Sequence, residues 1–273
     1  MTKNLFSRNL GYIDQKTQDQ LASTRVLIAG CGIGSLVAAS LARTGITSFI
    51  LVDGDVVDNH NLNRQFFFHD QINISKVGAL KENLLKINPS IHVEAIEENI
   101  GATNAKTFVD KVDIIIDTID FLDLPGIVAL HDEAHKQSKM LISSFSVGYG
   151  AAAMYLYGES NDPTPIRKLF QLPDTGSVEK ISYIERYIEL FTKIAKRLDP
   201  KVVEVMTNVF SQMAEGKVCP APQLAIGAHE VAAICSTFLV NTVKQDIRLK
   251  SGEIVITKLN HYDSKSSEVI ALI

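Results

Sequence analysis

The chain has 273 residues, of which 46% are hydrophobic and 21% are charged, a composition typical of soluble globular proteins. A formal net charge of −4 offers no general surface for a polyanion, so a nucleic acid is not expected as the main partner. Three cysteines are too few for a disulfide framework or a four-cysteine zinc site. The first residues contain no apolar stretch of the signal-peptide type, so a cytoplasmic location is expected.

The first half of the chain alternates strand-like and helix-like segments. Repeated strand–helix–strand units indicate a parallel sheet with right-handed crossovers. The predicted strands are 25–29, 47–53, 91–96 and 112–117, and the predicted helices are 36–43 and 76–87.

The second half has a different pattern. Apolar residues recur at spacings of three and four between Ile181 and Leu198, which predicts a helix with one apolar face. Pro200 interrupts this pattern, and a second helix follows it. The segment 224–243 carries His229 and other polar residues, so a buried helix is favoured over a membrane span. Further strands are expected at 140–144, 151–157, 253–258 and 268–272.

These segments predict a single domain over residues 1–273. We expect an α/β fold with a Rossmann-like mixed sheet, parallel in its N-terminal half and antiparallel in its C-terminal strands. Residues 159–218 are expected to form a helical insertion within this domain.

A glycine-rich loop joins the first predicted strand to the first predicted helix. Gly30, Gly32 and Gly34 let the backbone approach an anion, and the helix N-terminus supplies amide groups. Asp53 ends the next strand, 19 residues after Gly34, where a ribose-binding carboxylate belongs. This combination predicts a nucleotide site. It does not separate ATP from NAD, so an NAD-dependent oxidoreductase stays an alternative.

Two cations beyond Asp53 favour a triphosphate. A nicotinamide enzyme needs no cations at Arg64 and Lys76, except to contact a 2′-phosphate. An enzyme that splits a triphosphate does need them, because cations stabilise the departing pyrophosphate. Asp120 follows a buried strand at the sheet edge where open α/β folds bind ligands. Its carboxylate suits the Mg²⁺ that accompanies ATP.

Six short motifs occur in a characteristic order. They are Arg8-Asn9, Arg25-Val-Leu-Ile-Ala-Gly-Cys-Gly, Leu51-Val-Asp-Gly-Asp, Asn61-Leu-Asn-Arg-Gln, Ser75-Lys76 and Asp117-Thr-Ile-Asp120. In this order the motifs resemble the ThiF/MoeB/HesA family, bacterial relatives of ubiquitin-activating enzymes. The resemblance implies a protein that binds ATP and Mg²⁺ and transfers AMP to a protein or peptide carboxylate, usually the C-terminal glycine of a small ubiquitin-like protein.

The resemblance also implies roles for individual residues. Asp120 matches a Mg²⁺ ligand, and Arg8 matches an arginine that reaches the ATP of a neighbouring subunit, which implies a homodimer. The residues implied at the nucleotide are Gly32 at the phosphates, Asp53 at the ribose, and Asn61, Arg64 and Lys76 at the triphosphate, with Gln65 nearby.

Four positions depart from the family pattern. Ile33 and Ser35 replace two glycines of the loop, and Phe121 and Pro125 stand where asparagine and arginine are usual. A catalytically degenerate, nucleotide-binding scaffold is therefore an alternative to an active adenylyltransferase. The paired Cys-x-x-Cys motifs of many members are absent from the sequence, so no structural zinc is expected.

The remaining cysteines and histidines give weaker signals. Cys219 precedes a predicted helix and is a weak candidate for a thioester-forming thiolate; an incidental cysteine near a turn is favoured. Cys31 and Cys235 are expected to be packing residues. His131 and His135 lie four residues apart on a predicted helix and suit a metal, but a solvated helix face is favoured.

Overall fold

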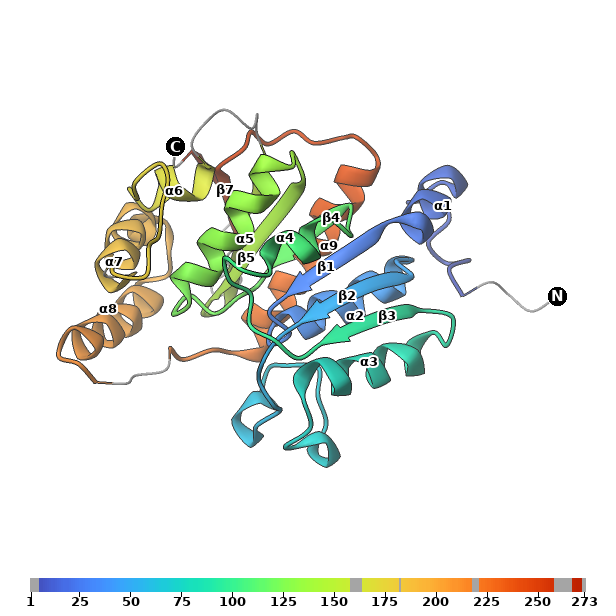
Figure 1. Ribbon diagram of the computed structural model, residues 1–273, viewed down its shortest axis with the longest axis horizontal. Coiled ribbons are helices and arrows are strands. Elements are labelled where there is room, and N and C mark those ends of the chain that lie inside the picture. The colour runs from blue at the N-terminus through green and yellow to red at the C-terminus, as the bar shows by residue number, and fades with distance from the viewer. Residues whose placement is uncertain (1–4, 158–163, 182, 218–220, 258–266, 272–273) are drawn as a thin grey trace.

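Eight strands form one sheet in the order β3-β2-β1-β4-β5-β6-β7-β8 (Figure 1). The computed structural model describes residues 5–157, 164–181, 183–217, 221–257 and 267–271. The strands are β1 Arg25–Ala29, β2 Ser48–Val52, β3 His92–Ile96, β4 Ile114–Asp117, β5 Met140–Val147, β6 Gly150–Leu156, β7 Glu253–Thr257 and β8 Ser267–Ala271.

Helices occupy most of the segments between these strands, and three short 3-10 turns occur in the described residues. The α-helices are α1 Gln15–Ser23, α2 Gly34–Thr44, α3 Lys76–Ile87, α4 Ala105–Val109, α5 Leu124–Lys136, α6 Pro165–Leu169, α7 Tyr183–Ile194, α8 Pro200–Ala214 and α9 Ala225–Val243. The 3-10 turns are η1 Asn59–Asn61, η2 His69–Gln71 and η3 Ala195–Arg197.

The pairing between neighbouring strands changes from parallel to antiparallel at β5. The first five strands in spatial order, from β3 to β5, pair in parallel. From β5 to β8 every pairing is antiparallel. The predicted α/β fold with a mixed sheet is therefore confirmed. All eight predicted strands are present, with shifts of a few residues at their ends.

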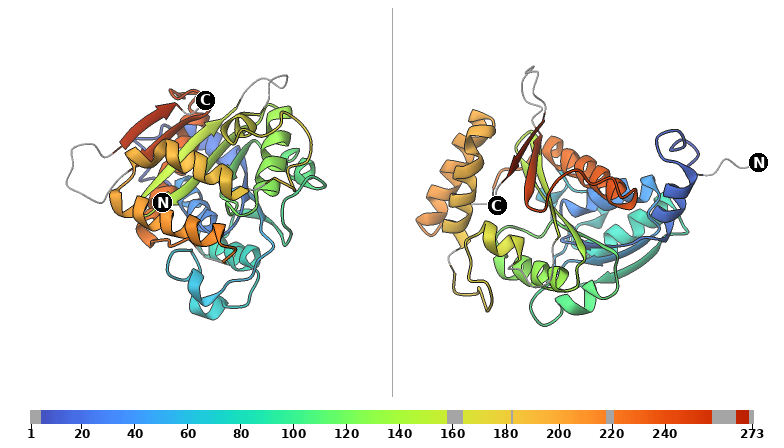
Figure 2. Two further views of the ribbon diagram at one scale, coloured as in Figure 1. Left: turned by 90° about the vertical axis from the view of Figure 1, so that its left-hand side faces the viewer. Right: turned by 90° about the horizontal axis from the view of Figure 1, so that it is seen from above.

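Both faces of the central strands are buried, as expected for a parallel sheet between two layers of helices. Val26 and Ile28 of β1 pack with residues of α2, α3 and α9. Leu27 and Ala29, which alternate with them, pack with residues of α4, α5 and the α6–α8 segment. Figure 2 shows α9 and α5 on opposite sides of the sheet. Period-two side-chain alternation therefore divides the core into two halves.

Helix α9 is the one described helix that is long and apolar enough to cross a membrane by length and composition, with a mean hydropathy of 1.3. In the structure it packs on the sheet and on α2. The Tyr155 hydroxyl donates to the Phe238 carbonyl at 2.7 Å, and the two rings stack 4.3 Å apart. On the α2 side, the Ser236 hydroxyl donates to the Ser40 hydroxyl at 2.8 Å. These contacts agree with the predicted buried helix.

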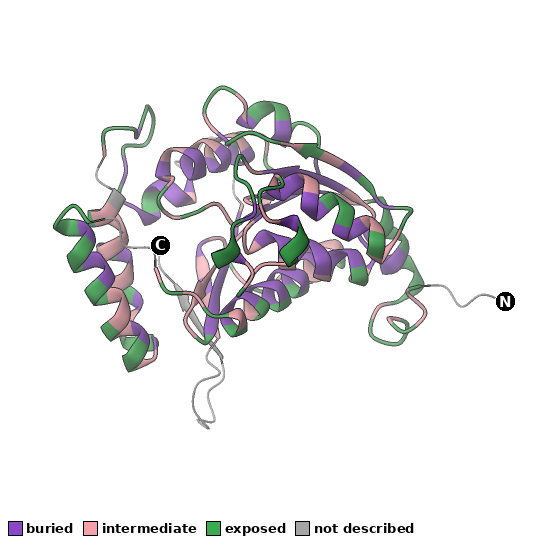
Figure 3. Ribbon diagram, turned by 90° about the horizontal axis from the view of Figure 1, so that it is seen from below, coloured by how far each residue is buried: buried purple, intermediate pink, exposed green. Residues whose placement is uncertain are grey.

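Three helices, α6, α7 and α8, follow β6 in the region predicted to be helical. The predicted interruption at Pro200 is confirmed: α7 and η3 end before it, and Pro200 begins α8. The Asp199 carboxylate accepts the Lys201 amide hydrogen at 2.7 Å. Figure 3 shows buried, intermediate and exposed residues mixed along α7 and α8; the buried ones include Leu190 and Ile194 of α7 and Val202, Val209, Phe210 and Met213 of α8. The division of the chain into one domain with an insertion at 159–218 stays a prediction.

We predict that Gly30→Ala destabilises the fold by roughly 2–5 kcal/mol. Gly30 has φ +84°, and a Cβ there would lie 2.5 Å from the Thr118 carbonyl oxygen, which is backbone and cannot move aside cheaply. Urea unfolding measures the loss in the free energy of unfolding. Gly101→Ala is the matched control, because a Cβ at Gly101 meets nothing within 4 Å. Equal losses in the two variants would contradict the steric argument.

Candidate active site

A cavity of about 1010 Å³ lies at the carboxyl ends of β1, β2, β4 and β5. This is the edge at which open α/β sheets bind ligands. The structure brings most of the predicted site residues to its wall. Those lining the cavity are Gly30, Gly32, Asp53, Asn61, Arg64, Gln65, Lys76 and Asp120.

The glycine loop is held against the start of the β4–α5 loop. The Thr118 hydroxyl donates to the Gly30 carbonyl at 2.7 Å. A Cβ at Gly34 would lie 2.5 Å from Thr118 Oγ1, so this glycine permits close packing of α2 and does not line the cavity. A Cβ at Gly32 would lie 3.2 Å from Gln65 Nε2. Gly30 and Gly32 both line the cavity, so the loop presents backbone to it, as a phosphate cradle requires.

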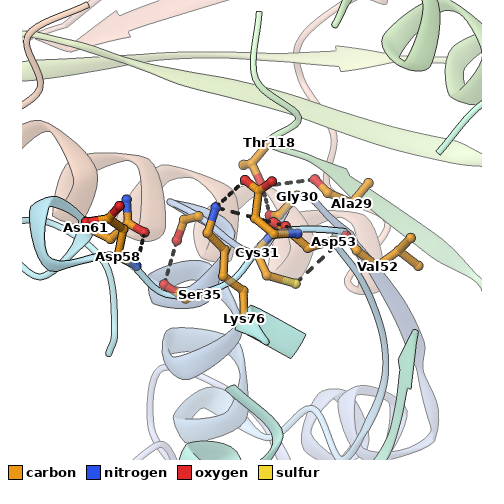
Figure 4. A network of polar contacts seen from close by, with 12 residues as sticks. Ala29, Gly30, Cys31, Ser35, Val52, Asp53, Asp58, Asn61, Lys76 and Thr118 are labelled. Carbon is orange, nitrogen blue, oxygen red and sulfur yellow. Dashed lines mark hydrogen bonds and ion pairs between the residues drawn. The ribbon is translucent and has the colours of Figure 1, made fainter. Parts of the chain in front are cut away.

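Asp53 connects three segments of the site (Figure 4). Its carboxylate accepts the Cys31 amide hydrogen at 2.6 Å and the Asp55 amide hydrogen at 2.8 Å. Lys76 Nζ, at the start of α3, lies 4.0 Å from Asp53 and donates to Asp55 at 2.7 Å. Burial raises the pKa of Asp53, and Lys76 opposes this shift. The lysine and the carboxylate are both held nearly buried at the cavity wall.

Arg64 contacts a segment that is distant in the sequence. Its Nε donates to Gln223 Oε1 at 2.5 Å, and its Nη1 donates to the His60 carbonyl at 2.9 Å. Partial burial lowers the pKa of Arg64, and the charge of Asp120 opposes the shift. A guanidinium stays protonated in proteins, so Arg64 presents a fixed cation to the cavity beside Asp120. Gln223 also lines the cavity, and no local motif identified it.

Asn61 and Gln65 lie on the segment that carries Arg64. Asn61 is 4% exposed, and its Oδ1 accepts the Asp58 amide hydrogen at 2.9 Å. Gln65 Oε1 is buried without a hydrogen-bond partner among the described residues. A buried amide oxygen is costly to leave unpaired, so this atom is suited to a donor supplied by a bound ligand.

A buried polar cluster lies at the wall of the cavity. The Asp117 carboxylate contacts His131 Nε2 at 2.7 Å and accepts the Ser143 hydroxyl hydrogen at 3.0 Å. Asp117 and His131 are each 3% exposed. The solvated helix face favoured for His131 and His135 is therefore wrong, because both side chains face the core side of α5. No group of three or more metal-ligating side chains occurs in the part of the chain that the structure describes.

The ThiF family model matches residues 6–271 of the sequence. The chain belongs to the ThiF family. Within this family, the departures at Ser35, Phe121 and Pro125 have local structural reasons. The Ser35 hydroxyl donates to the Gly32 carbonyl at 2.6 Å and accepts the Phe66 amide hydrogen at 2.8 Å. Pro125 lies in the first turn of α5, where its missing amide hydrogen costs nothing.

Phe121 packs against α7. Its ring meets the Tyr187 ring edge-on, with the centroids 5.1 Å apart, and Tyr187 also contacts Phe170 at 4.9 Å. Burial raises the pKa of the Tyr187 phenol well above its usual value, and the charges of Asp117, Asp120 and Asp123 raise it further. Tyr187 is therefore a neutral side chain at the junction between the acidic β4–α5 loop and the α6–α8 helices.

Curated relatives of this ThiF-family chain match it over part of its length. It is 33% identical over 114 residues to ubiquitin-like modifier-activating enzyme 5 of Caenorhabditis elegans, which covers 37% of this chain and 27% of that enzyme. It is 34% identical over 113 residues to the Porphyra purpurea protein named "Probable molybdopterin-synthase adenylyltransferase", and this match covers 41% of this chain and 30% of that protein. The match thus spans under a third of these relatives.

Solved structures extend the comparison to the whole fold. The structure of Escherichia coli MccB with ATP superposes with a TM-score of 0.70 at 22% identity, covering 99% of this chain and 72% of MccB. PaaA superposes with a TM-score of 0.64 at 18% identity, covering 94% of this chain and 66% of PaaA. At these identities the likeness establishes the shared fold.

Two further predicted residues, Arg8 and Cys31, do not line the cavity. Arg8 is exposed and belongs to the segment before α1, which precedes the N-terminal end of β1, opposite the cavity edge. Cys219 lies outside the described residues. Cys31 lies in the glycine loop but is fully buried, and burial raises its pKa well above the usual value. Cys235 is also fully buried, and burial raises its pKa to about 12, so packing roles are confirmed for both thiols.

Asp53→Asn should remove one source of pH dependence from stability. Because the pKa of Asp53 is raised from 3.8, the folded state binds this proton more readily than the unfolded chain. The free energy of unfolding therefore falls as the pH rises from 3.8 through the raised pKa. As the pH rises from 3.8 through the raised pKa of Asp53, the difference between variant and wild type should move in favour of the variant.

Chemical denaturation across this pH range measures that difference. Glu82→Gln, at an exposed position of α3, is the control and should follow the wild type. A constant difference between Asp53→Asn and the wild type would show that burial does not raise the pKa of this carboxyl.

Proposed function

We propose that this chain is an ATP-dependent adenylyltransferase that activates the C-terminal carboxylate of a protein or peptide. The products are an acyl-adenylate and pyrophosphate. The observation that carries the proposal is the placement of Arg64 and Lys76 at one cavity with the glycine loop, Asp53 and Asp120. Two cations at the phosphate end match the charge of a triphosphate. The names of the ThiF-family relatives, both activating or adenylylating enzymes, support the same chemistry.

The proposed reaction needs positioning and charge neutralisation. A carboxylate oxygen attacks the α-phosphorus in line, a new oxygen–phosphorus bond forms, and the bond to the bridging oxygen breaks. Pyrophosphate leaves with the electron pair of that bond. A carboxylate is ionised at neutral pH, so no general base is required. Arg64 and Lys76 stabilise the charge that develops on the phosphates, and the glycine loop fixes their position.

The donor set of the cavity fits Mg²⁺ together with ATP. Arg64 and Lys76 share the wall with several carboxylates, including Asp53, Asp55 and Asp120, which would repel a bare triphosphate. A divalent cation neutralises part of the phosphate charge and prefers oxygen ligands. Asp120 is exposed at the cavity and would hold the ion, while its Oδ1 accepts the Leu122 amide hydrogen at 3.0 Å.

Arg64→Ala should lower the rate of ATP–pyrophosphate exchange by about 100- to 1000-fold, because it removes a cation that stabilises charge in the transition state. Calorimetry on the same variant separates this loss from weaker ATP binding. Lys81→Ala, an exposed lysine on α3, is the control. Unchanged exchange in Arg64→Ala would remove Arg64 from the proposed role.

The same measurements distinguish the two alternatives. ATP binding by the wild type without any pyrophosphate release would identify a non-catalytic scaffold. Its supporting observation is Phe121, which packs on Tyr187 at a position where asparagine is usual. Binding of NAD with no response to ATP would indicate an oxidoreductase, in which Lys76 has no role.

We further propose a homodimer in which Arg8 completes the site of the partner subunit. Arg8 is exposed and does not line the cavity of its own chain, so it is available to a second copy. Arg8→Ala and Arg64→Ala should each be inactive alone. Mixed in equal amounts and allowed to exchange subunits, they should recover about a quarter of wild-type activity, since half the dimers are mixed and one of their two sites is intact. No recovery, with mixed dimers demonstrated, would place Arg8 outside the partner's site.

A further inference from the structure

The cavity has two parts with different chemistry. Its described charged side chains all lie between residues 53 and 123, on the glycine-loop side. The described lining residues between 143 and 210 include no charged side chain. We call the second part the uncharged compartment; β5, β6 and the α6–α8 helices form its walls. A boundary this sharp indicates that the two parts receive chemically different groups.

Aromatic and aliphatic side chains dominate the walls of the uncharged compartment. Leu190 and Ile194 of α7 are 5% and 2% exposed, and Phe191 and Met206 are half-buried at the cavity. The Phe191 ring meets the Phe210 ring with centroids 5.5 Å apart, so α7 and α8 are held together. Hydroxyl groups from the serines of β5 are the polar contribution on the sheet side.

The uncharged compartment begins next to the charged one. The Tyr187 ring lies with its centroid 5.1 Å from that of Phe121, the residue after Asp120, and these residues line the same cavity as Arg64. A group attached to a carboxylate that reacts beside Arg64 would therefore extend past Tyr187 toward Leu190 and Phe191. The whole cavity, at about 1010 Å³, lies at the upper end of the ~300–1,000 Å³ that enclose one drug-sized ligand. The uncharged compartment is the part of this volume that a group beside a nucleotide would occupy.

We infer that the substrate is a peptide or protein whose last residues are bulky and apolar, an inference that rests on the proposed adenylation. A diglycine end would leave the apolar walls of the compartment without contacts. A charged end would lose its hydration there without gaining an opposite charge from any described wall residue. An apolar end fits the walls and buries its surface as it brings the carboxylate to the α-phosphate.

The test is calorimetry with three acetylated peptides of equal length, each in the presence of a non-hydrolysable ATP analogue and Mg²⁺. The peptides end in Leu-Phe, Gly-Gly or Glu-Glu and are otherwise identical. The Leu-Phe peptide should bind about 10- to 100-fold more tightly than the Gly-Gly peptide, the effect of burying one large apolar side chain. The Glu-Glu peptide should bind most weakly.

Substitutions in the wall of the uncharged compartment test whether the peptide binds there. Met206→Glu places a charge in the compartment and should abolish the preference for the apolar peptide. Met206→Gln keeps the side-chain length and should reduce the preference, which covers the case in which the glutamate variant does not fold. Asn208→Glu, exposed on the same helix, is the matched control. Each variant should still bind the ATP analogue.

The outcomes separate this inference from the proposed function. Equal or tighter binding of the Gly-Gly peptide, or binding of none of the three, would overturn the apolar specificity. The inference would also be overturned if the Met206→Glu variant folds and still prefers the Leu-Phe peptide to the same extent. Pyrophosphate exchange is measured in parallel. Preferential binding of the Leu-Phe peptide without exchange would overturn adenylation and leave the assignment of the compartment in place.

Discussion

The carboxylate of Asp53 fixes the geometry of the charged side of the cavity. It stands at the end of β2 and accepts amide hydrogens from the glycine loop and from its own following turn. Lys76 faces it across the start of α3. One side chain therefore joins β2, the loop after β1, and the helix that carries the lysine. A charged group at this depth persists because hydrogen bonds and a cation compensate for part of its lost hydration.

Local sequence patterns were sufficient for the strands, the glycine loop and the cations near it. The runs at Arg25–Ala29 and Ile114–Asp117 are apolar because both faces of a parallel sheet are covered, and such runs are visible in the sequence. The order of the motifs predicts Asp53, Arg64 and Lys76 as site residues. The topology of the sheet brings the segments that carry them to one edge.

Those local patterns do not predict contacts between segments that are distant in the sequence. Gln223 meets Arg64 from 159 residues away, and nothing in its own neighbourhood marks it. His131 was misjudged for a related reason: helical spacing fixes which residues share a face but not which face meets the core. Its partner Asp117 belongs to a neighbouring strand. The polar pair is buried because each group satisfies the other, which only the packed structure reveals.

The departures from the ThiF pattern are linked through the α6–α8 helices. Phe121 contacts Tyr187 of α7, and the same ring contacts Phe170 after α6. An asparagine at position 121 would place a polar amide against these rings, so the aromatic residue is consistent with helices that close over the end of the sheet. The uncharged compartment then arises from the same packing. The packing of the α6–α8 helices therefore accounts both for phenylalanine in place of asparagine at position 121 and for the apolar wall of the uncharged compartment.

The electrostatics of the site show a desolvation cost that the proposed ligand groups would offset, phosphates at Arg64 and a ribose hydroxyl at Asp53. Burial raises the pKa of Asp53 and lowers that of Arg64, so desolvation disfavours the charged form of each. A fold selected for stability alone would replace such groups with apolar ones of similar size. Their retention beside a glycine cradle is explained when phosphate and ribose groups supply the missing partners. Charges held in place before the ligand arrives need no reorganisation during the reaction, and this is the physical source of catalysis in a site that relies on positioning.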